Sequence, residues 1–174
     1  MQEEIINKVS QSELITLDLE TFFPSDDIQI FDLKPFLFME LILKEKDFRA
    51  ALTTTDWSVY KDKIVGVYCS ADAVIPVWAY MLVTSYLQPY AKEVIMGDEA
   101  AVLRQILTSR IQAIDPNEYK DKRIVVKGCG EKPVGEFAYL EITKLLRPVA
   151  KSIMYGEPCS TVPVFKAQSS KSKA

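Results

Sequence analysis

The chain has 174 residues, of which 48% are apolar and 26% are charged, and its formal net charge at pH 7 is −3. This is the composition of a globular domain long enough to bury a core, without the basic field that nucleic-acid binding requires. The absence of histidine excludes Ser-His-Asp and Cys-His catalysis, together with every histidine-based metal site.

The chain begins with acidic residues where a signal peptide would be basic, and its most apolar run, residues 74–87, is too short to span a bilayer. We therefore predict a cytoplasmic protein that binds neither membranes nor nucleic acid. Three cysteines in a chain without an export signal predict free thiols, metal ligands or a reactive thiol rather than disulfides.

The first predicted elements are short and have distinct patterns. The first ten residues have a helical pattern, residues 15–19 alternate apolar and polar side chains as a strand does, and residues 28–31 read as a second strand. Residues 33–52 carry large apolar side chains at helical spacing, which predicts a helix.

Two segments of the chain, residues 56–98 and 115–157, resemble each other. Both contain the motif Tyr-Lys-Asp-Lys, and one extra residue, Arg123, then shifts the register so that Cys69 matches Cys129. The register returns in the following loop, and this alignment contains 16 identities over 43 positions. We interpret the two segments as an internal duplication, because no fold requires these motifs.

Each repeat reads as a strand, a loop, a helix and a second strand. The predicted strands are residues 64–68, 93–96, 123–127, 152–155 and 162–165, and the predicted helices are residues 74–91, 98–114 and 134–151. This order predicts an α/β fold, with a mostly parallel sheet, helices on both faces and two duplicated βαβ units. We expect a single domain over residues 1–166 and a disordered tail over residues 167–174. We also expect the helix at 74–91 to be buried over most of its circumference.

All three cysteines and several carboxylates fall near the predicted carboxyl ends of strands, where open α/β sheets bind ligands. Three thiolates and one carboxylate would complete a zinc shell or hold an iron–sulfur cluster, provided that the first strands of the two repeats are adjacent. A metal-free version would use one thiolate as a nucleophile. The candidate residues are Cys69, Cys129, Cys159, Asp72, Asp98 and Glu157. The alternative is three small buried hydrophobic side chains, because no Cys-x-x-Cys spacing is present.

A second candidate site is the glycine-containing loop of the second repeat. Gly128 and Gly130 follow a predicted strand and precede a helix, and Glu157 ends the next strand, as in a degenerate dinucleotide-binding fingerprint. The spacing to the third glycine, Gly135, is two residues too long for that fingerprint. The looser interpretation is a small anion bound at the N-terminus of the helix.

These observations leave three hypotheses open. The preferred one is a small protein with a cysteine-lined metal or thiol site, and whether it is an enzyme is left open. The alternative is a non-catalytic interaction module that forms a homodimer, in which aromatic residues anchor a partner rather than fill the core. The aromatic residues in question are Trp57, Trp78, Tyr80, Tyr86 and Tyr90. The third hypothesis is nucleotide or small-anion binding at Gly128–Gly130, with an unknown small-molecule ligand.

Several long phrases of the sequence resemble one known family. They are KEKDFRAAL, YCSADAVIPVWAYM, LQPYAKEVIMGD, KGCG and SIMYGEPCSTVPVFK. Together they resemble the bacterial domain-of-unknown-function family 2480, over residues 15–166. The resemblance implies an α/β protein of the bacterial cytoplasm, and it assigns no activity, substrate or catalytic residue.

Overall fold

The computed structural model describes residues 14–128 and 130–168, which form two compact units. The first unit comprises Met1–Phe23 and Ile106–Ala174, and the second comprises Pro24–Gln105. The predicted N-terminal helix, Cys129 and most of the predicted tail lie outside the described residues. The prediction of a single domain over residues 1–166 stays a prediction.

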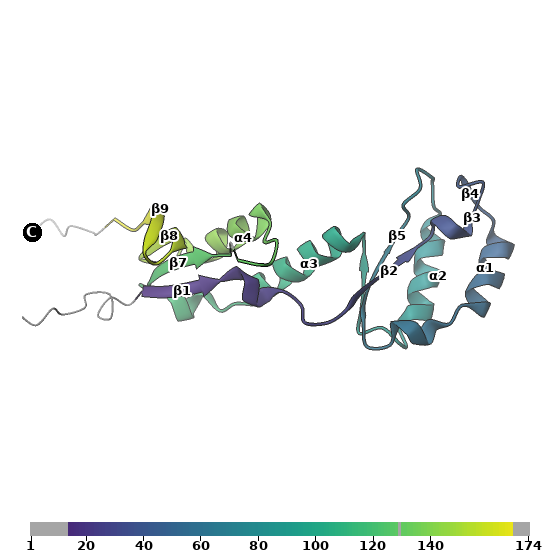
Figure 1. Ribbon diagram of the computed structural model, residues 1–174, viewed down its shortest axis with the longest axis horizontal. Coiled ribbons are helices and arrows are strands. Elements are labelled where there is room, and N and C mark those ends of the chain that lie inside the picture. The colour runs from purple at the N-terminus through teal and green to yellow at the C-terminus, as the bar shows by residue number, and fades with distance from the viewer. Residues whose placement is uncertain (1–13, 129, 169–174) are drawn as a thin grey trace, which may run out of the picture. The chain divides into compact units, whose positions relative to one another are not determined.

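The first unit contains a four-stranded sheet in the order β1-β7-β8-β9 (Figure 1). Its strands are β1 (Leu14–Asp18), β7 (Arg123–Lys127), β8 (Ser152–Glu157) and β9 (Ser160–Lys166). The first three strands pair in parallel, and β9 pairs with β8 in the antiparallel direction. The helix α4 (Glu136–Leu146) connects β7 to β8, and a 3-10 helix at Pro116–Tyr119 precedes β7.

The second unit contains a parallel three-stranded sheet in the order β2-β5-β6. Its strands are β2 (Ile28–Asp32), β5 (Ile64–Tyr68) and β6 (Glu93–Met96), and α2 (Val77–Leu87) connects β5 to β6. The unit also holds the small hairpin of β3 (Leu37–Phe38) and β4 (Ile42–Leu43), the helix α1 (Glu45–Thr54) and a 3-10 helix at Trp57–Tyr60. The helix α3 (Glu99–Gln112) begins in this unit and ends in the first one.

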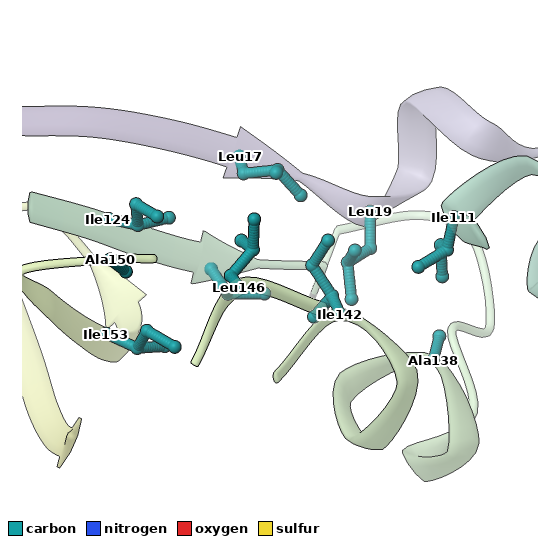
Figure 2. Close-up of a cluster of buried hydrophobic side chains, with 10 residues drawn as sticks. Leu17, Leu19, Ile111, Ile124, Ala138, Ile142, Leu146, Ala150 and Ile153 are labelled. Carbon is teal, nitrogen blue, oxygen red and sulfur yellow. The ribbon is translucent and has the colours of Figure 1, made fainter. Parts of the chain in front are cut away.

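Each unit has its own hydrophobic core. In the first unit, side chains of β1, β7 and β8 pack against α4, as Figure 2 shows for Leu17, Ile124, Ile142 and Leu146. The core of the second unit is more aromatic. There the ring of Trp57 stacks on Phe31 and Tyr86, at centroid distances of 5.4 and 5.1 Å. Trp57 therefore fills the core of this unit and is not an anchor for a partner.

The mixed α/β class and the largely parallel sheets are confirmed, and most predicted strands are found at their predicted positions. β5 and β7 are built from β-branched residues, which fit a buried parallel strand. Both connecting helices are shorter than predicted. α2 begins after Pro76, whose backbone is extended, and it ends before Pro89, which has no N–H to continue the helix. Among the described residues, no helix is long and apolar enough to cross a membrane.

The predicted helix over residues 33–52 is wrong in its first half. Residues 34–43 form a 3-10 turn and a hairpin instead, and only α1 is helical. At the tip of the hairpin, Met39 and Glu40 have φ angles of 52° and 58°, in the left-handed region that ends a helix. The apolar spacing was misleading because Phe36 and Phe48 do meet, with ring centroids 5.4 Å apart, but from two different elements.

The prediction that the helix at 74–91 is buried all round is also wrong. Ala79, Val83 and Leu87 are fully buried along one stripe of α2, whereas Val77 is 74% exposed and Met81 is 67% exposed. The helix lies on one face of a three-stranded sheet, so a single stripe reaches the core. An apolar stripe is left on its outer side.

Candidate binding grooves

The first unit has a groove beside α4. Its volume is about 990 Å³, and residues of β7, β8 and β9 line it together with the loop that precedes the helix. The lining residues are Val126, Gly128, Gly130, Lys132, Pro133, Val134, Glu136, Tyr139, Leu140, Thr143, Lys144, Arg147, Ile153, Met154, Tyr155 and Val164. Within it, the rings of Tyr139 and Tyr155 meet edge to face at 5.5 Å.

The second unit has a groove of about 730 Å³ at the corresponding place beside α2. Its lining residues are Val67, Val77, Tyr80, Met81, Thr84, Ser85, Gln88, Val94, Ile95 and Met96. Every one of them lies 59 positions before a lining residue of the first groove. Three of these pairs are identical in residue type, including Tyr80 with Tyr139 and Thr84 with Thr143.

The spacing of 59 also holds for the backbone around the grooves. Asp62 and Asp121 both have a left-handed φ angle, of 60° and 58°. The amide of Asp62 donates to the carbonyl of Tyr90, and the amide of Asp121 donates to that of Val149. The strand β5 pairs with β6 in the same register in which β7 pairs with β8. Two positions 59 apart therefore correspond structurally in the two units.

This constant spacing corrects the predicted alignment of the repeats. The alignment placed an extra residue at Arg123, but Arg123 begins β7 as Ile64 begins β5, so nothing is inserted. Cys69 then corresponds to Gly128 and not to Cys129. In the first unit, a Cβ atom at Gly128 would stand 2.8 Å from the hydroxyl oxygen of Tyr139. Glycine at this position gives the tyrosine the room that it needs.

The predicted metal ligands are divided between the two units. Cys69, Asp72 and Asp98 belong to the second unit, whereas Cys159 belongs to the first. β5 and β7 lie in different sheets, so the adjacent strands that a shared metal requires are not found. In residues 14–128 and 130–168, no group of three or more cysteine and carboxylate side chains is placed to hold a metal ion.

The cysteines and carboxylates have other surroundings instead. Cys69 is half-buried and Cys159 is exposed, and both are free thiols. Burial raises the pKa of the Tyr80 hydroxyl, and the neighbouring Cys69 adds to the increase. Asp98, predicted as a metal ligand, instead caps α3 by accepting a hydrogen bond of 2.9 Å from the amide of Ala101.

The loop at Gly128–Gly130 already holds an anion that belongs to the chain itself. The carboxylate of Glu20, just after β1, accepts hydrogen bonds from the amides of Gly130 and Glu131. The side chain of Lys132 reaches the backbone oxygen of Glu20 at 3.5 Å. The donors that the anion hypothesis assigned to a small ligand are thus used by Glu20. Binding of a nucleotide or a small anion here stays a prediction.

Glu157, the predicted ribose-binding acid, belongs to a charged cluster at the carboxyl ends of the strands. The ammonium group of Lys127 lies 3.2 Å from a carboxylate oxygen of Asp18 and 3.8 Å from one of Glu157. The hydrogen bond to Asp18 raises the pKa of Lys127, and the charges of Asp18 and Glu157 raise it further. The cluster therefore keeps Lys127 protonated, which does not suit it to act as a base at neutral pH.

Asp32 ends β2 of the second unit as Asp18 ends β1 of the first. Its carboxylate accepts hydrogen bonds from the amide of Lys34 at 2.9 Å, and from the amide and hydroxyl of Ser70 at 3.0 and 2.5 Å. Burial raises the pKa of Asp32, but these hydrogen bonds outweigh burial, and the net effect is a lowered pKa. Asp32 thereby ties the end of β2 to the loop after β5.

Of the residues that line the grooves, Gly128 and Gly130 were predicted as part of a binding site, and Tyr80 as a candidate anchor for a partner. No role was predicted for Thr84, Tyr139 or Thr143, and the pairs Tyr80 with Thr84 and Tyr139 with Thr143 were not recognised. The available signal was their spacing of four residues within each helix, which places both hydroxyl groups on one side of the helix. This signal becomes informative only when the two helices are aligned at the separation of 59 positions that relates the two units.

The fold and the grooves define an α/β protein of two parallel-strand units, each with an apolar groove beside its connecting helix. The chain belongs to the family described as "Protein of unknown function (DUF2480)", whose model matches residues 3–167. The family predicted from the sequence is thereby confirmed. No curated protein and no solved structure matches the chain.

Proposed function

We propose that the protein is a binding module whose first-unit groove takes an apolar ligand that carries an acidic group. The composition of that groove carries the proposal. Its walls include Val126, Leu140, Ile153 and Val164, which can cover an apolar body, and a volume near 990 Å³ lies at the upper end of the range for ligand sites.

The charges around this groove favour an acidic group on the ligand. Lys132, Lys144 and Arg147 line it, against the single carboxylate of Glu136. Lys144 also pairs with the nearby Glu141 at 3.0 Å, and the guanidinium of Arg147 stacks on Phe165 at 3.8 Å. These contacts hold the two cations in place beside the groove, and the groove stays positive at its helix C-terminal end.

We further propose that the two units arose by duplication of one βαβ unit. The fixed spacing of 59 supports this, because it relates strand register, left-handed turns and groove residues at once. In this view both grooves descend from one ancestral groove. The retained tyrosine and threonine hydroxyls are its common polar contacts, and the first unit alone acquired charges.

The cysteine-lined metal or thiol site, by contrast, gains no support. Its ligands are divided between two sheets, and one of them, Cys129, lies outside the described residues. The binding module therefore replaces it as the favoured hypothesis.

Two naphthyl probes of opposite charge test the proposed function. The full chain is labelled with carbon-13 at its five methionine methyl groups and titrated with 1-naphthalenesulfonate or 1-naphthylmethylammonium. We expect the sulfonate to shift the methyl signal of Met154, in the groove, and to leave that of Met39, on the hairpin, unchanged. It should bind at least about fivefold more tightly than the ammonium probe, which corresponds to ~1 kcal/mol.

The chain offers a matched pair of variants for this test. Leu140→Asp places a carboxylate in the first groove and should abolish the shift of Met154. Met81→Asp makes the same change at the corresponding position of the second unit and should leave the shift intact. Equal binding of both probes would refute the preference for an acidic group, and a shift that survives Leu140→Asp would show that the groove is not the site.

A further inference from the structure

The strand β6 has an open edge in the second unit. It pairs with β5 on one side, and no strand of the described residues pairs with it on the other. In the first unit, the corresponding strand β8 is covered on that side by β9. The fold therefore shows, within one chain, this type of edge both covered and uncovered.

β6 contains neither proline nor lysine, and its pairing with β5 contains no bulge. Exposed edges are commonly protected by proline, lysine or a bulge. The edge strand β9 has Pro163, and its pairing with β8 contains a bulge. The four residues of β6 are Glu93, Val94, Ile95 and Met96, so a single glutamate is its only charge.

The surface beside this edge is apolar and exposed. Val77 and Met81 on α2 project from the outer stripe of the helix, and Met96 at the end of β6 is 63% exposed. Together these side chains border the second groove. An apolar patch next to an open strand edge is typical of a surface that another protein chain covers.

The charges of the two grooves indicate which chain this is. In a contact about a two-fold axis, the residues near the axis lie close to their own copies, so charged residues at that place repel each other. None of the ten residues that line the second groove is charged. At the corresponding positions, the first groove carries Glu136, Lys144 and Arg147. Only the second groove is suited to face an identical surface.

We propose that two copies of the chain associate through their β6 strands, which pair in the antiparallel direction about a two-fold axis. Centring the pair on Ile95 places Val94 of each copy opposite Met96 of the other, and Glu93 opposite Gly97. Apolar side chains then meet apolar side chains, and the two glutamates do not face each other. The two three-stranded sheets become one sheet of six strands.

In this arrangement the α2 helices of both copies lie on the same face of the joined sheet. The stripes that contain Val77 and Met81 then face each other across the two-fold axis. The contact would cover the surface that the burial of α2 leaves exposed. The dimer rests on the strand edge and the uncharged groove of the second unit, and it does not depend on ligand binding in the first.

Sedimentation equilibrium of the full chain tests the dimer. We expect a dimer at micromolar concentration. Met81→Asp should raise its dissociation constant at least about 30-fold, because the two-fold axis brings two new carboxylates together. The matched control, Leu140→Asp, should leave the dissociation constant unchanged. Met81 is exposed, so the variant should keep the circular dichroism spectrum of the parent chain.

Hydrogen exchange identifies the surface. The amide of Gly97 already donates to Val67 of β5, so the amides of Val94 and Met96 face the open edge. These two amides should exchange more slowly as the protein concentration increases through the dissociation constant, and should lose this dependence in Met81→Asp. A chain that is monomeric at about 100 µM refutes the dimer and leaves the ligand-binding proposal standing. A dimer in which these amides exchange at a rate independent of concentration would place the interface elsewhere and equally refute the proposal.

Discussion

The two cores can be tested separately with one matched pair of substitutions. Leu87 and Leu146 occupy corresponding positions near the ends of α2 and α4, and both are completely buried. Replacement by alanine removes three carbon atoms, which costs ~2.4 kcal/mol at about 0.8 kcal/mol for each buried carbon. The cavity left behind raises the expected loss to about 2.5–5 kcal/mol. With a urea m-value of about 2 kcal/mol/M, the unfolding midpoint should fall by about 1.2–2.5 M.

The tryptophans make this experiment specific for one unit. Both of them, Trp57 and Trp78, lie in the second unit, so their fluorescence reports its unfolding. Leu87→Ala should lower the fluorescence midpoint by the full amount. Leu146→Ala should leave the fluorescence midpoint unchanged. It should instead lower the midpoint of that part of the circular dichroism transition that belongs to the first unit. Gln88→Ala, at an exposed neighbour, is the control.

Two results would refute this account of the cores. A loss below ~1 kcal/mol in Leu87→Ala would show that the side chain does not fill a packed core. An equal shift of the fluorescence midpoint by both variants would show that the chain unfolds as one cooperative unit rather than through two separate cores.

Two carboxylates allow further predictions. The pKa of Asp32 is lowered on folding, so its contribution to stability is complete above the ordinary aspartate pKa of about 3.9 and is lost as the pH falls through the lower value. Asp32→Asn should therefore weaken the acid dependence of the urea midpoint between about pH 4 and pH 2, whereas Asp72→Asn, at an exposed site, should preserve it. Glu20→Ala should accelerate hydrogen exchange at the Gly130 amide and cost the first unit about 1 kcal/mol, because the amides of the loop lose their acceptor. Unchanged exchange at that amide would contradict the role assigned to Glu20.

The interpretation of the cysteines shows how a small misalignment misleads a functional prediction. Pairing Cys69 with Cys129 required one inserted residue, and the gain was two matching cysteines at the ends of matching strands. The structure contains no insertion, and Cys69 corresponds to Gly128. Cys69 lies near Tyr80 in the second unit, and Gly128 lies near the hydroxyl of Tyr139 in the first. This difference between the units points to local packing rather than to a shared metal.

The sequence by itself determined those features that depend on neighbours in the chain. β-branched runs placed β5 and β7, and the helix predicted over residues 98–114 is found as α3. The prolines at both ends of α2 carried a local signal as well, but the prediction over residues 74–91 ran past them. The repeated motifs were visible for the same reason, because a strand, a turn and a helix each have a local pattern. Long phrases of the sequence also identified the family.

Only the tertiary structure decided which strands become neighbours. β1 pairs with β7, more than a hundred residues further along the chain, and β2 pairs with β5, although nothing in the local pattern of these strands selects those partners. Strand order depends on which apolar faces can be buried together, and no local window of the sequence contains that information. The division into two sheets, the open edge of β6 and the exposed stripe of α2 all follow from this pairing. Apart from Gly128 and Gly130, which the sequence had already indicated, the residues of the candidate grooves were for that reason recognised in the structure and not in the sequence.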